Sequence, residues 1–297
     1  MRTRTASLGA TAALALAVAT PVSADSYRFS VVARNLDRPV GIAVDGSEMV
    51  YFTEVPDPGV GGGANGVSSL DLDTGVVTRL HSGEPEPTNI ALDRDGDLYW
   101  TCKSAGVVLR LAEGAVAPFA TGLEEPSGIA IGRRGAVYIT EIPEPGVPGG
   151  RNRVSVIRGD DKIVLSTGEP EPTDVAVARN GDLYWTCKTA GVILRRSYGK
   201  VSVFRDKLDH PSGIAIDHKG ETLYFTEVPT PGVPGDQGGK NRVRAINLRT
   251  GALRTIHTGD PEPTDVAVAR NGNLYWTCTS AGVIVEAKRR GGRAGHY

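Results

Sequence analysis

Three sets of side chains that can bind metals or transfer protons recur along this chain at equivalent places. One set is three carboxylates, each at the end of a short apolar run: Glu54, Glu141 and Glu227. The second set is three thiols at the same place in the alternate runs: Cys102, Cys187 and Cys278. The third set lies thirteen residues before each thiol: Asn89, Asp174 and Asp265. Convergent carboxylates suit hard cations such as Ca²⁺ or Mg²⁺, whereas thiolates suit softer metals.

These places are equivalent because the chain consists of internal repeats. The segment EPTNIALDRDGDLYWTCKSAGVVLR begins at Glu86, and close copies of it begin at Glu171 and Glu262. Segments of a second type, such as HPSGIAIDHKGETLYFTE, alternate with them and begin at Arg38, Glu125 and His210. Regular self-similarity on this scale is typical of propellers and repeat arrays.

Each segment predicts a four-stranded sheet. In the segment that begins at Glu86 the expected strands are 89–93, 98–103, 107–111 and 116–120, with a tight turn at 94–97. Apolar residues run together instead of alternating strictly, which indicates sheets buried on both faces. Six sheets packed radially bury such faces. The sequence therefore predicts an all-β fold, a six-bladed β-propeller with a pseudo-threefold two-blade repeat.

The two ends of the repeat array predict how the ring closes. The last blade has only three strands, the third being 283–287, and a strand at 27–33 precedes the first blade. This N-terminal strand is expected to complete the last blade and to remove an exposed sheet edge.

The predicted architecture places the three sets of polar residues at one mouth of the central channel. In such a blade the innermost strand begins, and the second strand ends, at the same mouth. The sequence therefore predicts an acidic mouth with Ca²⁺ or Mg²⁺ as the expected ion. The candidate metal ligands are Glu54, Glu141 and Glu227. The candidate ligand-binding residues are Asn89, Asp174, Asp265, Cys102, Cys187 and Cys278.

Each of these interpretations has a structural alternative. The glutamates occupy places that suit a bond to a neighbouring blade. The cysteines suit packing, because a free cysteine behaves as a small buried hydrophobe. Blades two apart are too distant for a disulfide, which needs Cα atoms within about 7 Å. We therefore expect three free thiols, used for packing, redox chemistry or a soft metal.

The phrases PSGIAI, GAVYITE and LYFTE resemble the repeat of NHL-type six-bladed propellers. They resemble most of all the repeat of streptogramin lyases (virginiamycin B lyase), which has the pattern P-x-G-I…G-x-L-W-F-T-E. The resemblance spans the whole chain after the predicted signal peptide. It implies a six-bladed propeller and makes a metal-assisted lyase or hydrolase one functional hypothesis. Gluconolactonase-like and strictosidine-synthase-like propellers are related to the same architecture more distantly.

The sequence departs from both enzyme types at residues that matter for activity. A streptogramin lyase has a histidine close after its T-E motif, whereas Val55, Ile142 and Val228 follow T-E here. Gluconolactonases place acidic or amide metal ligands directly after the strand-initiating proline, where this chain has only Val, Thr or Ser. The remaining candidate for a catalytic base is His210, which precedes Pro211 at the same mouth.

Three hypotheses on function follow from these observations. The first is a secreted propeller that binds a small molecule or a divalent cation at the acidic mouth. The second is a metal-assisted lyase or hydrolase of the streptogramin-lyase-like type. The third is a protein-interaction scaffold that uses the Pro- and Gly-rich segments after each T-E. Near-identical repeats favour binding, because a catalytic acid and base must differ.

The termini and the charge predict where the protein acts and which partners it lacks. Residues 1–24 combine arginines, an apolar run and a small-residue cleavage site near Ala24, which predicts a signal peptide and secretion. The propeller is expected over residues 25–288, with a basic Gly-rich tail at 289–297. The net charge of −1 gives no reason to expect nucleic acid or a membrane as a partner. We expect a monomer.

Overall fold

The computed structural model describes residues 27–46, 49–56, 64–143, 151–229 and 239–290. The predicted signal peptide, nearly all of the predicted tail and the Pro- and Gly-rich segments after each T-E lie outside these ranges. The described residues contain β-strands and two short 3₁₀ turns, η2 (Arg133–Gly135) and η3 (Thr279–Ala281). No helix among them is long and apolar enough to cross a membrane.

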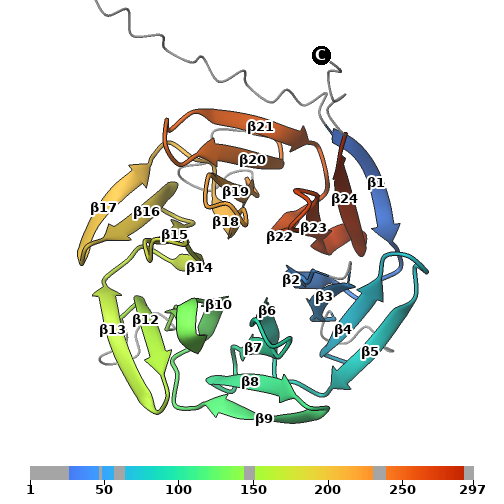
Figure 1. Cartoon of the computed structure of the whole chain (residues 1–297), viewed down its shortest axis with the longest axis horizontal. Coiled ribbons are helices and arrows are strands. Elements are labelled where there is room, and N and C mark those ends of the chain that lie inside the picture. The colour runs from blue at the N-terminus through green and yellow to red at the C-terminus, as the bar shows by residue number, and fades with distance from the viewer. Residues whose placement is uncertain (1–26, 47–48, 57–63, 144–150, 230–238, 291–297) are drawn as a thin grey trace, which may run out of the picture.

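The strands form six four-stranded antiparallel sheets arranged in a ring, the blades of a propeller (Figure 1). Blade 1 contains β2 (Pro39–Val44), β3 (Met49–Glu54), β4 (Gly66–Asp71) and β5 (Val77–Ser82). Blade 2 contains β6 (Pro87–Leu92), β7 (Leu98–Cys102), β8 (Val107–Ala112) and β9 (Ala115–Ala120). Blade 3 contains β10 (Pro126–Ile131), β11 (Val137–Glu141), β12 (Arg153–Arg158) and β13 (Asp161–Thr167).

Blade 4 contains β14 (Pro172–Val177), β15 (Leu183–Cys187), β16 (Val192–Ser197) and β17 (Lys200–Arg205). Blade 5 contains β18 (Pro211–Ile216), β19 (Thr222–Glu227), β20 (Arg242–Asn247) and β21 (Leu253–Thr258). Blade 6 contains β22 (Pro263–Val268), β23 (Leu274–Cys278), β24 (Val283–Arg289) and, as its outer strand, β1 (Tyr27–Ala33). The predicted six-bladed propeller is confirmed.

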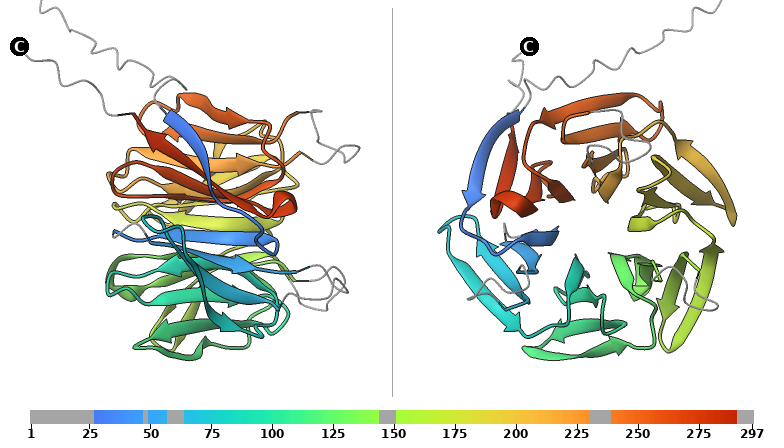
Figure 2. Two further views of the ribbon diagram at one scale, coloured as in Figure 1. Left: turned by 90° about the vertical axis from the view of Figure 1, so that its right-hand side faces the viewer. Right: turned by 180° about the vertical axis from the view of Figure 1, so that it is seen from behind.

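The ring closes through the N-terminal strand. Strand β1 pairs with β24 in antiparallel register, from Tyr27 opposite Arg289 to Ala33 opposite Ile284. Both views in Figure 2 place these two strands side by side. The last blade therefore takes its fourth strand from the other end of the chain, as the sequence predicts.

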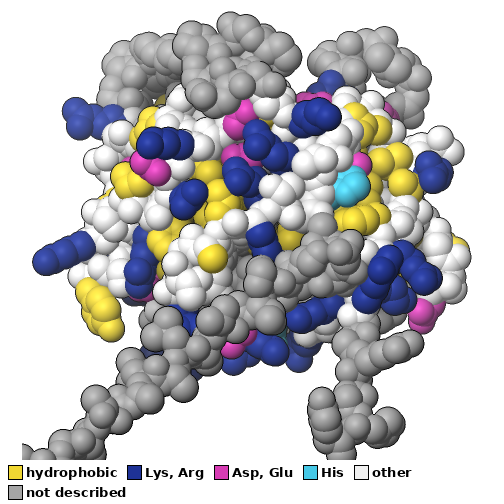
Figure 3. Space-filling model, turned by 90° about the horizontal axis from the view of Figure 1, so that it is seen from above, with side chains coloured by type: hydrophobic (Ala, Val, Ile, Leu, Met, Phe, Trp, Pro, Cys, Tyr) yellow, Lys and Arg dark blue, Asp and Glu magenta, His cyan; other side chains and the backbone are white. Residues whose placement is uncertain are grey.

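Hydrophobic packing between adjacent blades forms the core. Trp100, Trp185 and Trp276 are fully buried in the second strands of blades 2, 4 and 6. Each packs against its own inner strand and against the preceding blade, as Trp185 does with Val154 and Val156 of blade 3. The rim of the ring seen in Figure 3 has Lys and Arg side chains spread over it, with hydrophobic side chains between them.

A ring of threonines also joins the blades around the channel. In every blade the threonine just before the Glu or Cys that ends the second strand bonds to a backbone carbonyl of the next blade. Thr101 Oγ1, for example, donates to the carbonyl of Ser127 at 2.6 Å. The same oxygen accepts the backbone N–H of Asn89 at 3.1 Å. This N–H lies at an irregularity in the β6–β7 pairing, so the threonine replaces a missing ladder bond.

Candidate functional site

The inner strands begin at one mouth of the channel, which we call the proline mouth. Each inner strand starts with a proline that lies opposite the last residue of the second strand, as Pro39 lies opposite Glu54 and Pro87 opposite Cys102. The structure therefore places the predicted glutamates and cysteines at the expected end of their strands. Their surroundings decide what each set can do.

The structure brings Asn89, Asp174 and Asp265 together. All three are buried in the third position of their inner strands. Asn89 Nδ2 donates to Asp174 Oδ1 at 2.9 Å, and Asp265 is close enough for its charge to raise the pKa of Asp174. The predicted grouping of this set is therefore seen in the structure.

The backbone of other blades occupies the remaining oxygens of the two aspartates. Asp174 Oδ2 accepts the N–H of Ile214 at 2.8 Å, and Asp265 Oδ2 accepts the N–H of Ile42 at 2.9 Å. Burial raises the pKa of Asp174 well above its ordinary value, and the charge of Asp265 raises it further. Burial also raises the pKa of Asp265, to about 7. Two carboxyl groups so placed titrate as one unit that retains a proton into the neutral range.

The three predicted metal ligands each form bonds within or beside their own blade. Glu141 accepts a bond from Lys162 Nζ at 2.6 Å and one from Ser155 Oγ at 3.1 Å. Glu227 forms ion pairs with Arg242 at 3.2 Å and Arg244 at 3.1 Å.

Glu54 has the same kind of surroundings. It pairs with Arg79 at 2.9 Å and accepts a bond from Ser68 Oγ at 2.8 Å. Within the described residues, no three His, Cys, Asp or Glu side chains are grouped as a metal ion would need. Each of the three glutamates already has a cationic partner from its own blade.

The three cysteines are free thiols, fully buried in three different hydrophobic clusters. Cys102 packs with Trp100, Cys187 with Trp185, and Cys278 with Trp276. Burial raises the pKa of each thiol to about 12, with a further contribution from a nearby carboxylate. A thiol with so high a pKa is not a nucleophile near neutral pH. The structure therefore does not bring the cysteines to one shared site.

His210 lies at the proline mouth, at the junction of blades 4 and 5. Its side chain is only 4% exposed, and neither ring nitrogen has a hydrogen-bond partner among the described residues. The imidazole lines a cavity of about 590 Å³ together with Lys188 and the segment from Asp206 to Leu208. The nearest recorded polar atom is Asp209 Oδ1, which lies 3.5 Å from Nδ1, beyond the usual length of a hydrogen bond.

The equivalent junction of blades 2 and 3 is occupied by an ion pair instead. There Lys103 Nζ lies 3.4 Å from Glu125 and 3.9 Å from Glu86. His210 takes the place of Glu125 in the repeat, and Lys188 takes the place of Lys103. No ion pair of Lys188 is recorded within the described residues. Where blades 2 and 3 have a lysine–glutamate ion pair, blades 4 and 5 therefore have a lysine, a histidine and a cavity between them.

The opposite mouth of the channel, where the inner strands end, contains a larger cavity of about 940 Å³. We call it the turn mouth, because the turns between first and second strands line it. The sequence alone predicted no function for these turns. The pattern was nonetheless visible: aligned blade by blade, the second residue after the inner strand is an arginine in four blades and a histidine in a fifth. These residues are Arg94, Arg133, Arg179, His218 and Arg270.

Solved structures of enzymes share the fold of this chain. A streptogramin B lyase matches with a TM-score of 0.63 and 17% identity, over 89% of this chain and 98% of that chain. A catalytically inactive virginiamycin B lyase from Staphylococcus aureus with quinupristin matches with a TM-score of 0.59 and 22% identity, over 88% of each chain. A gluconolactonase from Xanthomonas campestris matches with a TM-score of 0.70 and 14% identity, over 89% of this chain and 90% of that chain.

Sequence comparison adds no further relatives, since no family model and no curated protein matches the chain. The structural matches agree with the resemblance seen in the repeats. The chain is a six-bladed β-propeller that shares its fold with streptogramin lyases and gluconolactonases.

Proposed function

We propose that this protein binds a small molecule at the proline mouth, in the cavity beside His210. One observation carries the proposal: a buried imidazole faces a cavity with both ring nitrogens lacking hydrogen-bond partners among the described residues. A buried polar group without a partner costs about 1–3 kcal/mol. A ligand that hydrogen-bonds to the ring would remove that cost.

The charges around the cavity favour a ligand with acceptor oxygens. Lys188 is half-buried and lines the cavity with its ammonium group unpaired among the described residues. At the junction of blades 2 and 3, the equivalent ammonium group of Lys103 faces the carboxylate of Glu125. A ligand carboxylate or lactone oxygen would take the place of that side chain and could accept a bond from His210 as well.

Lyase or hydrolase chemistry is the second candidate. Enzymes of both kinds share this fold, and His210 occupies a position that is asymmetric among the three repeats. Asp209 Oδ1 lies on the Nδ1 side of the ring, at 3.5 Å. An aspartate there can orient a histidine base and stabilise the imidazolium formed when Nε2 takes a proton from substrate. The group that would stabilise the developing negative charge is Lys188.

Secretion and the scaffold hypothesis rest on residues outside the described ranges. The predicted signal peptide supports an activity outside the cell, as part of the proposal. The scaffold alternative depends on the Pro- and Gly-rich segments, so no recorded contact supports it. A divalent cation at the proline mouth stays a prediction.

Calorimetric titration of the full chain tests the binding proposal. The probes are sodium gluconate, glucono-1,5-lactone and quinupristin, chosen after the gluconolactonase and the quinupristin complex among the structural matches. We expect one of them to bind with a stoichiometry of one. His210→Gln should weaken that binding at least tenfold, since it removes a directed hydrogen bond in a buried site. His81→Gln is the matched control, because His81 lies on the outer strand β5.

Two results separate the candidates. Binding that His210→Gln leaves unchanged, or no binding by any probe at millimolar concentration, would overturn the proposal. Product analysis by mass spectrometry tests the second candidate. Binding of the lactone or of quinupristin without conversion would refute lyase or hydrolase activity on that compound class, while binding itself would stand.

A further inference from the structure

Five of the six blades place an arginine or a histidine at the turn mouth. The five residues are Arg94, Arg133, Arg179, His218 and Arg270, and the sixth blade has Gly46 at the equivalent position. All five side chains are exposed to solvent, unlike the buried charges of the proline mouth. Within the described part of the chain, no ion pair or hydrogen bond is recorded for any of the four guanidinium groups.

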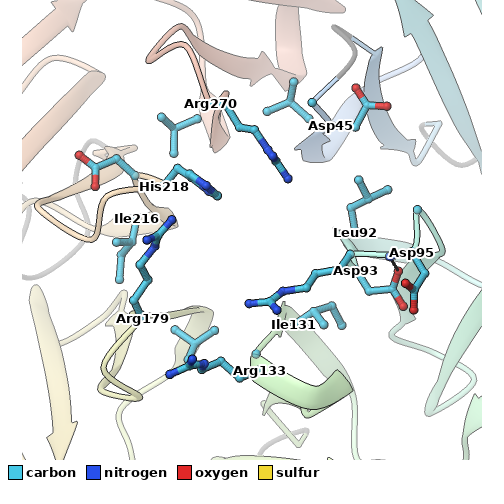
Figure 4. A pocket seen from close by; sticks show the side chains of 18 of the residues that line it. Asp45, Leu92, Asp93, Asp95, Ile131, Arg133, Arg179, Ile216, His218 and Arg270 are labelled. Atoms are coloured by element: carbon cyan, nitrogen blue, oxygen red, sulfur yellow. Dashed lines mark hydrogen bonds between the residues drawn. The ribbon is translucent and has the colours of Figure 1, made fainter.

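The side chains converge on the cavity. Figure 4 shows Arg179, His218 and Arg270, from blades 4, 5 and 6, directing their nitrogen atoms towards the space they enclose. The carboxylates of Asp45 and Asp95 point away from it in the same view. The cavity therefore has a positive centre and an acidic outer rim.

The turns themselves hold the acidic residues of the rim. Asp93 Oδ1 accepts the backbone N–H groups of Asp95 and Asp97 at 2.9 and 3.0 Å. Asp217 Oδ1 accepts the N–H of Glu221 at 2.7 Å, and Asp45 Oδ1 accepts that of Met49 at 2.9 Å. These carboxylates stabilise the tight turns, and the long arginine side chains reach past them into the cavity.

We propose that the turn mouth is a binding site for a compact polyanion, a small molecule with at least two phosphate or carboxylate groups. Guanidinium groups bind both kinds of oxyanion with paired N–H donors. The site lies at the opposite end of the channel from His210, so it is independent of the function proposed above. It needs no metal and no covalent step.

The acidic rim favours a compact ligand over a nucleic acid. An extended phosphate backbone crossing the mouth would pass close to Asp45, Asp93, Asp95 and Asp217, which repel it. A small polyanion can enter the centre without contacting the rim, and about 940 Å³ is ample for it.

The pKa of His218 responds to the charges of the same cavity. Burial lowers the pKa of His218, and the nearby charges of Arg179 and Arg270 lower it further. Asp217 acts in the opposite direction, and Arg94 adds a smaller lowering effect. An anion bound among the arginines would reverse this repulsion and raise the pKa of His218.

Calorimetry of the full chain at low ionic strength tests the proposal with inorganic pyrophosphate and citrate as separate probes. The two arms distinguish a phosphate site from a carboxylate site. We expect one-to-one binding of at least one probe, weakened by added NaCl. Arg133→Gln should weaken it about tenfold, as expected when one charged hydrogen-bond donor is lost. Arg134→Gln should leave it unchanged, because this neighbouring arginine does not line the cavity.

A second readout locates the anion. In proton–carbon spectra of histidine-labelled protein, the His218 resonance should titrate at higher pH when the probe is bound. Equal weakening by Arg133→Gln and Arg134→Gln would indicate non-specific charge attraction and overturn the proposal. The absence of binding by both probes, an unchanged His218 titration, or preferential binding of an unstructured oligonucleotide would overturn it as well.

Discussion

The two mouths of the channel use their charges in opposite ways. At the proline mouth the carboxylates of Glu54, Glu141 and Glu227 are buried, and each forms an ion pair with an arginine or lysine of its own blade. At the turn mouth the arginines are exposed and lack recorded partners within the described residues. Both sets repeat around the ring, so repetition alone does not distinguish a structural role from a binding role.

The two mouths differ in whether the repeated charged groups already have ion-pair and hydrogen-bond partners within the protein. A buried carboxylate that is ion-paired and hydrogen-bonded within its own blade has its charge balanced there, and its loss would leave the partner charge uncompensated. An exposed guanidinium group with no partner contributes little to stability and can bind an anion at small cost. The junction at His210 belongs with the second kind, because the histidine replaces an ion-paired glutamate. Substitutions at the two mouths should therefore affect different properties.

The largest effect on stability should come from the proline mouth. Glu227→Gln removes the charge that pairs with Arg242 and Arg244. Breaking a buried ion pair on one side typically costs about 3 kcal/mol of unfolding free energy. Arg179→Gln at the turn mouth should change that free energy by less than about 0.5 kcal/mol. Urea unfolding followed by the fluorescence of the three buried tryptophans measures both. If both variants lost the same unfolding free energy, the charges at the two mouths would not differ in their structural role.

A glycine beside the aspartates should be the next most sensitive position. A Cβ on Gly128 would lie 2.4 Å from the Cα of Asp174, a backbone atom that cannot move aside. We expect Gly128→Ala to lower the free energy of unfolding by about 2 kcal/mol, as overpacking does in a tight core. Gly46→Ala is the control at the turn mouth, where the nearest atoms belong to the flexible Arg270 side chain at 3.4 Å. The same urea titration should detect no loss there beyond a few tenths of a kcal/mol.

The fold was readable from the sequence because each blade repeats its strand and turn pattern. The closing strand at 27–33 matches β1, and the expected strand 98–103 differs from β7 by one residue. The inner strand begins two residues earlier than expected, at Pro87. Proline has no backbone N–H to donate, but at the first position of a strand that N–H is not needed for pairing. Pro87 can therefore be the first residue of the strand, although proline was expected to precede it.

The candidate site was only partly readable. Equivalent positions in a ring converge, so the grouping of Asn89, Asp174 and Asp265 could be predicted. The partners of the glutamates could not, because Arg79 and Lys162 come from outer strands whose sequences differ between blades. Which charges are satisfied depends on such pairings. The cationic turn position was visible in the alignment, but a charged turn residue is usually solvated, and only the cavity gives it a role.

The smallest of the expected stability effects concerns pH and the pair of Asp174 and Asp265. In the unfolded chain both carboxyl groups ionise near pH 4, whereas burial in the folded protein raises both pKa values, that of Asp265 to about 7. The folded state therefore binds more protons than the unfolded state between these limits. Stability contributed by the bound proton is complete below about pH 4 and is lost as the pH rises to about 7.

The variant Asp265→Asn isolates this effect, because blade 2 already has an amide, Asn89, at the equivalent position. The wild-type protein should lose about 1 kcal/mol more unfolding free energy than the variant between pH 6 and pH 7, and the two should run parallel above pH 8. Urea midpoints measured at half-unit steps of pH give the difference. A wild-type curve parallel to that of the variant across the whole range would mean that the carboxyl group of Asp265 takes up no extra proton when the protein folds. Asp265 would then be a buried charge whose pKa is not raised, and the contrast between the two mouths would have to be withdrawn.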